Sequence, residues 1–182
     1  MRPSWDEHFL GLATYIGQSR ATCDRGKCGA VAVLNNREIA TGYVGAPSGL
    51  PHCSEVGHLF SIVDDVKRCV RTIHAEQNLL VQSAITGVPL VGATVYSTME
   101  PCITCAQLLV AVGIERFVAQ HTYHAATNSR ILFEQSGIAL DVMNDTHAEY
   151  EPTLPGFVGM LKSDNLSSNK QTWLRQYYNT QY

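Results

Sequence analysis

Two short segments constrain the fold most strongly, because their side chains must meet in space to act together. They are His74-Ala75-Glu76 and, further along the chain, Pro101-Cys102-Ile103-Thr104-Cys105. One histidine and two cysteines can supply three ligands to a zinc ion. Three protein ligands leave a fourth position open, which distinguishes a catalytic zinc from a structural one. Any fold for this chain must therefore bring the two segments to one place.

Hydrophobic spacing and turn residues predict an α/β fold. Ser4 can cap a helix over residues 4–19, with Glu7 as its capping-box partner. Runs rich in β-branched residues predict a hairpin, and Gly, Pro, His and Ser predict a loop over residues 45–60. The expected architecture is a three-layer α-β-α sandwich around a five-stranded mixed sheet. Its remaining elements are strands at 29–34, 38–44, 93–98, 116–120 and 138–142 and helices at 74–84, 102–112 and 127–136.

Composition narrows the function classes. The chain has 182 residues and a net charge of −3, which argues against a broad nucleic-acid-binding surface. It contains no apolar run of transmembrane length, and its first residues lack the apolar stretch of a signal peptide. We therefore expect no membrane partner and a cytoplasmic protein, whose six cysteines are metal ligands or free thiols. We expect a catalytic domain over residues 1–143 and an extension over 144–182 that packs on the domain or at a subunit interface.

The two segments are both predicted at helix N-termini, where partial positive charge favours thiolates. Cys102 and Cys105 are three residues apart and share one helix face. Glu76 is not needed as a ligand and is free to move protons on a zinc-activated water, as both base and acid. The combined pattern is typical of zinc-dependent nucleobase deaminases. The alternatives are a closed zinc site with a fourth ligand and thiols that bind no metal.

Further segments carry a resemblance to a known family. Residues 19–25 are similar to an S-x-x-x-C-x-R segment, and residues 41–53 to T-G-Y-N-G-x-P-x-G-L-P-H-C. With residues 71–78 and 98–102, they make the chain resemble the deoxycytidylate (dCMP) deaminase family of the cytidine deaminase superfamily over residues 5–142. This resemblance implies hydrolysis of dCMP to dUMP for thymidylate synthesis. It also implies a homohexamer. In the family, dCTP activates the enzyme and dTTP inhibits it, and Mg²⁺ could accompany the triphosphate.

One position departs from the family pattern. The family has Asn where this chain has Val44, and in related deaminases that Asn contacts the sugar of the nucleotide. Loss of one such hydrogen bond costs about 0.5–1.5 kcal/mol. Val44 is therefore either a tolerated change that lowers activity or a sign of altered substrate or effector recognition.

The remaining candidates for nucleotide binding rest on the resemblance and on the need for donors to phosphate. For the substrate they are Val44, Asn78, Tyr123 and Arg25. Asn78 could also orient the metal ligands from outside the metal's coordination shell. For an effector they are Arg20, Tyr43 and Gly45. For the arginines, the alternative is ordinary surface charge.

A second zinc site is also suggested by the resemblance. Cys23, Cys53 and Cys69 match positions where some family members hold a structural zinc. His52, His58 or Cys28 could complete the set. The alternative is a group of ordinary buried thiols.

Two other classes of function remain open. The chain could deaminate another substrate, such as another cytosine nucleotide or nucleoside, a pterin or flavin precursor, or a tRNA base, although its negative net charge argues against tRNA. It could also be a non-catalytic zinc-binding or nucleotide-binding module. Glu76 argues against such a module, because a purely structural site does not need a proton carrier.

Overall fold

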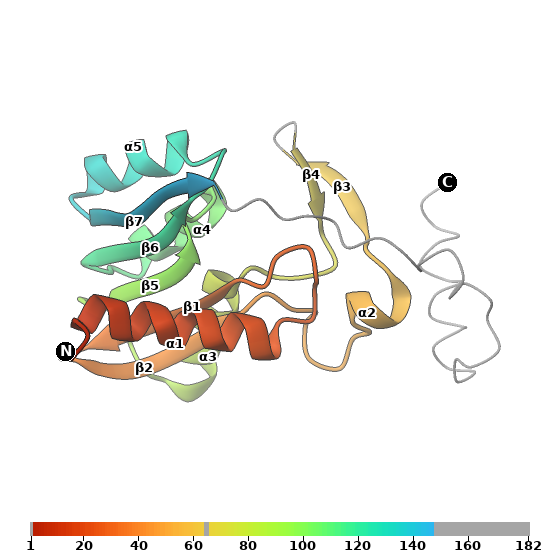
Figure 1. Cartoon of the computed structure of the whole chain (residues 1–182), viewed down its shortest axis with the longest axis horizontal. Coiled ribbons are helices and arrows are strands. Elements are labelled where there is room, and N and C mark those ends of the chain that lie inside the picture. The colour runs from red at the N-terminus through yellow and green to blue at the C-terminus, as the bar shows by residue number, and fades with distance from the viewer. Residues whose placement is uncertain (1, 64–65, 148–182) are drawn as a thin grey trace. The chain divides into compact units, whose positions relative to one another are not determined.

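The computed structural model describes residues 2–63 and 66–147 and has a five-stranded mixed sheet at its centre (Figure 1). The strand order is β2-β1-β5-β6-β7. β1 pairs antiparallel with both β2 and β5, whereas β5, β6 and β7 run parallel. The expected three-layer sandwich around a mixed sheet is confirmed.

The elements follow the predicted order, with three additions between β2 and α3. The predicted loop over residues 45–60 contains the short helix α2 and the start of β3, and β3 and β4 form a hairpin that we did not predict. The helices are α1 (Trp5–Arg20), α2 (Cys53–Val56), α3 (Ala75–Thr86), α4 (Ile103–Ala111) and α5 (Thr127–Ser136). The strands are β1 (Gly29–Leu34), β2 (Arg37–Tyr43), β3 (Phe60–Val63), β4 (Val66–Cys69), β5 (Thr94–Met99), β6 (Arg116–Thr122) and β7 (Ala139–His147).

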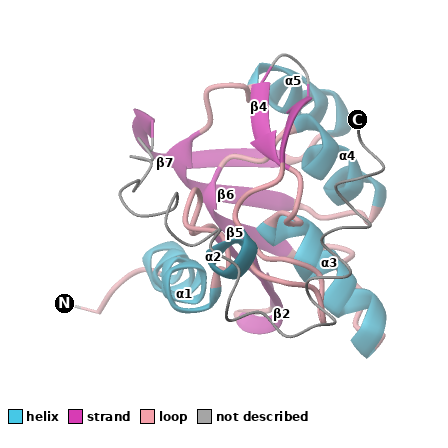
Figure 2. Ribbon diagram, turned by 90° about the vertical axis from the view of Figure 1, so that its right-hand side faces the viewer, coloured by secondary structure: helices cyan, strands magenta, loops and turns pink. Residues whose placement is uncertain are grey.

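Helices cover both faces of the sheet. Figure 2 shows α1 on one side and α3, α4 and α5 on the other. Alternate residues of β1 point to opposite faces of the sheet. Val31 and Val33 pack against α1, whereas Ala30 and Ala32 belong to the core under the other helices. This is the period-two alternation expected of a central strand that is covered on both faces.

Local signals in the sequence account for several element ends. The capping box between Ser4 and Glu7 is present at the start of α1. Asn35 and Asn36 both have positive φ, at 53° and 58°, which is the geometry of a two-residue hairpin turn. Gly87 and Gly137 end α3 and α5 in the left-handed conformation. These turns and caps define where the strands and helices around the site begin and end.

The close approach of β2 to α3 depends on one glycine. A Cβ atom at Gly42 would overlap the backbone of α3 at Ala75 and Leu79. The small residue therefore brings the first turn of α3, which contains Glu76, directly against the sheet.

The C-terminal extension that we predicted for residues 144–182 lies mostly outside the described residues. β7 itself continues to His147. Among the described residues, no helix combines the length and the apolar character that a membrane span needs.

Candidate active site

The three predicted metal ligands converge at the N-termini of α3 and α4. His74 is the N-cap residue of α3, and Cys102 is the N-cap residue of α4. The Nδ1 atom of His74 lies 3.5 Å from Sγ of Cys102 and 3.4 Å from Sγ of Cys105. A tetrahedral zinc with bonds of about 2.3 Å to sulfur and about 2.0 Å to nitrogen separates its ligand atoms by about 3.5–3.8 Å. The three side chains therefore fit zinc.

The thiols of this group are electrostatically suited to a cation. Hydrogen bonding to Cys105, with a further contribution from His74, lowers the pKa of Cys102 to about 3 in spite of its burial. Cys102 is therefore a thiolate at neutral pH, the form that binds zinc. Both cysteines are buried, so a metal is needed to compensate the charge that they would share as two thiolates.

Glu76 lies beside the metal ligands and is only 6% exposed. Its carboxylate accepts a hydrogen bond of 3.3 Å from the hydroxyl of Ser97 on β5. Burial raises the pKa of Glu76 above its ordinary value. A raised pKa suits a carboxyl group that must both accept and donate a proton near neutral pH.

A cavity of about 230 Å³ opens onto this group. Its walls include His74, Glu76 and Cys102 together with three residues that we predicted to bind substrate, which are Arg25, Val44 and Tyr123. Val44 is 9% exposed, and its backbone is held by hydrogen bonds to Cys28 and Thr22. The remaining walls are formed by Cys23, Gly26, Cys28, Lys67, Arg68, Cys69, Thr72, Ala75, Met99, Glu100 and His124.

A buried ion pair positions one wall of the cavity. The side chain of Glu100 is fully buried and accepts hydrogen bonds of 2.7 and 2.8 Å from the guanidinium group of Arg130 on α5. The same carboxylate accepts a 2.9 Å hydrogen bond from the backbone N–H of Tyr123. The pair therefore fixes the segment after β6 that brings Tyr123 and His124 to the cavity.

The other candidate residues lie away from the cavity walls. Asn78 donates a 2.9 Å hydrogen bond to the backbone carbonyl of Tyr43 and so links α3 to the end of β2. Gly45 forms backbone hydrogen bonds with Ile73, next to His74. Arg20 ends α1 and is exposed. Asn78 therefore supports the wall at Val44, while none of the three effector candidates lines the cavity.

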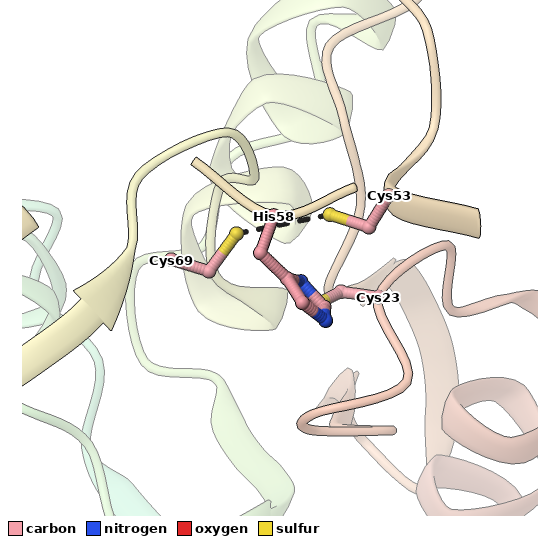
Figure 3. A group of neighbouring side chains, drawn as sticks. All are labelled: Cys23, Cys53, His58 and Cys69. Atoms are coloured by element: carbon pink, nitrogen blue, oxygen red, sulfur yellow. Dashed lines mark hydrogen bonds between the residues drawn. The ribbon is translucent and has the colours of Figure 1, made fainter. Parts of the chain in front are cut away.

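A second group of possible metal ligands lies at the base of the β3–β4 hairpin. Figure 3 shows Cys23, Cys53, His58 and Cys69 pointing toward one another. Sγ of Cys23 is 3.6 Å from Nδ1 of His58, and Sγ of Cys53 is 3.7 Å from Sγ of Cys69. Their ligand atoms all lie within 4.8 Å of one another. These separations also match those between the ligands of a tetrahedral zinc.

The fourth member of this group is His58, one of the three residues that the sequence left open. Its other ring nitrogen, Nε2, lies 3.0 Å from the carboxylate of Asp24. A carboxylate on the far nitrogen is the usual partner of a metal-bound histidine. His52 instead caps α2, and Cys28 lies against the cavity.

Sequence reasoning missed some functional residues. Glu100 stands in the segment that carries the resemblance, but its pairing with Arg130 joins positions 30 residues apart. Lys67 and Arg68 belong to the hairpin that was not predicted. The available signal was the pair of adjacent basic residues directly before Cys69.

Comparison with known proteins agrees with this geometry. A family model described as "Cytidine and deoxycytidylate deaminase zinc-binding region" matches residues 3–121. The chain is 45% identical over 125 residues to a deoxycytidylate deaminase of Mycobacterium phage D29, which covers 64% of this chain and 94% of the relative. It is 32% identical over 186 residues to ComE operon protein 2 of Bacillus subtilis, covering 98% of this chain and 96% of the relative.

A solved structure is similar in three dimensions as well. The dCMP deaminase of cyanophage S-TIM5, in complex with dCMP and dUMP, aligns with a TM-score of 0.65 and 27% sequence identity. The alignment covers 79% of this chain and 99% of that structure. The similar region therefore includes the whole of that deaminase.

Proposed function

Because the chain belongs to the cytidine and deoxycytidylate deaminase family, we propose that it hydrolyses dCMP to dUMP and ammonia. The observation that carries the proposal is the convergence of His74, Cys102 and Cys105 beside the buried carboxyl group of Glu76. The phage relatives similar to this chain are deoxycytidylate deaminases, and one is known with dCMP and dUMP bound. Such a reaction would supply thymidylate synthesis.

His74, Cys102 and Cys105 would hold the catalytic zinc. The ion would supply Lewis-acid activation of a water molecule for attack on the ring carbon that bears the amino group. Glu76 would move a proton from that water to the ring nitrogen, and then deliver a proton to the departing ammonia. Ser97 would hold the Glu76 carboxylate in place through the hydrogen bond to Oε1.

The cavity walls would orient the nucleotide. Tyr123 and Arg25 both line the cavity, where Tyr123 would contact the base and Arg25 the phosphate. Val44 offers an apolar surface where the family places an amide. We therefore expect sugar binding to be weaker at this wall, with Asn78 supporting the wall through Tyr43.

The second cysteine group would hold a structural zinc. Three cysteines and one histidine complete a closed tetrahedral set, which leaves no position for a water. Cys23 and Cys53 are buried, and hydrogen bonds from Cys23 and Cys53 lower the pKa of Cys69 far below its ordinary value. Such a site would join the α1–β1 connection, α2 and the hairpin.

Regulation and assembly are proposed from the family resemblance alone. We propose that the protein is a cytoplasmic homohexamer. We also propose that dCTP, together with Mg²⁺, activates the enzyme and that dTTP inhibits it. Arg20, Tyr43 and Gly45 would contact the effector. Light scattering with and without each nucleotide would test the assembly, and assays at several dCMP concentrations would test the regulation.

The first experiment is a deamination assay on the zinc-loaded protein, following the loss of cytosine absorbance with dCMP, CMP, deoxycytidine and dCTP. We expect turnover of dCMP. Glu76→Gln should retain zinc and lower kcat by at least about a hundredfold, since general acid–base catalysis contributes about 10²–10⁴. Glu38→Gln, at an exposed position on β2, is the matched control. Turnover that survives in Glu76→Gln would overturn the assigned mechanism.

A further inference from the structure

The β3–β4 hairpin places positive charge at one wall of the cavity. Lys67 and Arg68 on β4 both line it, and Arg25 lines it from the segment that follows Cys23. Among the described lining residues, the carboxylates are Glu76 and Glu100, and Glu100 is already paired with Arg130. These three cations therefore line the same cavity as the metal ligands His74 and Cys102.

Two of these cations contact one aromatic ring. The guanidinium carbon of Arg25 lies 4.9 Å from the centre of the Phe60 ring, and Nζ of Lys67 lies 4.4 Å from it. Phe60 is 43% exposed, so the ring presents both charges near solvent. Both cations also line the cavity, so an anion bound there would be attracted by each of them.

The cations are also placed on a rigid support. Arg25 is two residues from Cys23, while Lys67 and Arg68 are the two residues before Cys69. Cys23 and Cys69 belong to the Cys23, Cys53, His58 and Cys69 group, and Phe60 pairs with Cys69 across the hairpin. His58, in the same group, also packs against the Phe60 ring with centres 5.3 Å apart. The group therefore joins the chain segments that carry the three cations, and with zinc bound it would preorganise them for binding.

We propose that Lys67 and Arg68, together with Arg25, bind a phosphate monoester at the mouth of the cavity and make the enzyme select a nucleotide over a nucleoside. This inference rests on the proposed function and adds the hairpin as its specificity element. Arg68 provides the planar donor that suits phosphate, and Lys67 provides a compact charge. A pyrimidine ring at the metal ligands and a phosphate at these cations would then occupy one cavity.

The test uses the variants Lys67→Gln and Arg68→Gln in the zinc-loaded full chain. The matched controls are Lys27→Gln and Arg37→Gln, at exposed positions that do not line the cavity. Two experiments are made on each protein. Kinetics give KM and kcat for dCMP with and without dCTP, and calorimetry gives the Kd of dUMP and that of deoxyuridine. Zinc content and Tm show whether each variant is folded.

We expect each hairpin variant to raise KM for dCMP and Kd for dUMP about tenfold, which corresponds to about 1.4 kcal/mol. Deoxyuridine binding and kcat should remain within about twofold, and the controls should behave as wild type. Unchanged dUMP affinity in both folded variants would overturn the inference. Loss of dCTP activation with an unchanged KM for dCMP would also overturn the inference, because Lys67 and Arg68 would then bind the phosphates of the effector and not the phosphate of the substrate.

The binding measurement separates this inference from the proposed function. If the wild type does not turn over dCMP, the proposed function fails, but the preference for dUMP over deoxyuridine still decides the inference. If the wild type is active and the variants keep that preference, only the inference fails.

Discussion

Removal of Arg130 should affect both stability and substrate binding, because its partner cannot reach water. The Glu100 side chain is fully buried, whereas the Arg130 side chain is 51% exposed. Breaking a buried ion pair from one side costs about 3–5 kcal/mol, since a charge remains uncompensated. Because solvent can partly replace a half-exposed arginine, we discount this to about 2–3 kcal/mol for Arg130→Gln.

In a domain of this size, 1 kcal/mol shifts Tm by about 2–4 °C. The expected loss in Arg130→Gln is therefore about 4–12 °C, measured by calorimetry on the zinc-loaded protein. Arg130→Lys keeps the charge but not the two parallel hydrogen bonds, so its Tm should lie between those of Arg130→Gln and the wild type. Arg37→Gln, at an exposed position, should leave Tm unchanged.

The same substitution should raise KM for dCMP more than it lowers kcat. Glu100 holds the backbone N–H of Tyr123, so releasing Glu100 loosens a cavity wall and leaves Glu76 and the metal ligands in place. A variant with wild-type Tm would refute the energetic argument. A variant that is destabilised but has wild-type KM would refute the positioning of Tyr123 by this pair.

Three further predictions concern other parts of the molecule. Val44→Asn should raise kcat/KM for dCMP about two- to tenfold, the value of one hydrogen bond to the sugar, and an unchanged value would contradict a sugar contact there. Cys53→Ser should lower the zinc content from two ions per chain to one and reduce Tm, whereas a wild-type content of one would remove the second site. Arg116 lowers the pKa of Asp6, so Asp6 stabilises the fold when ionised. Asp6→Asn should therefore lower Tm at pH 7, with a difference that shrinks as the pH falls below about 4, and a constant difference would contradict the pairing.

The sequence predicted those features that depend on neighbouring residues. The capping box of α1 is a local signal of this kind, and the structure contains it. The Asn35-Asn36 turn and the glycine ends of α3 and α5 likewise depend on neighbouring residues alone. The sheet followed from the order of these elements, because short connections favour neighbouring elements in space. His74, Cys102 and Cys105 could be named as candidates because the chemistry of zinc restricts their types and spacing.

Features that depend on distant pairing could not be predicted. The choice of His58 over His52 and Cys28 depends on the turn after α2, which brings its ring beside Cys23 from 35 residues away. Glu100 lies in a segment that carries the resemblance, but nothing in the sequence pairs it with Arg130, and only the packing of α5 joins them. The β3–β4 hairpin has strands of four residues each, which is too short for a clear alternating pattern.

The separation of this hairpin from the main sheet has a consequence for how such enzymes diversify. β3 and β4 form their own two-stranded sheet, and the chain leaves and rejoins the domain beside the Cys23, Cys53, His58 and Cys69 group (Figure 3). A change in the length or charge of the hairpin would therefore leave the register of β1, β2 and β5 untouched. We therefore expect that grafting the hairpin between relatives would change the charge of the cavity wall and leave the metal ligands on α3 and α4 in place.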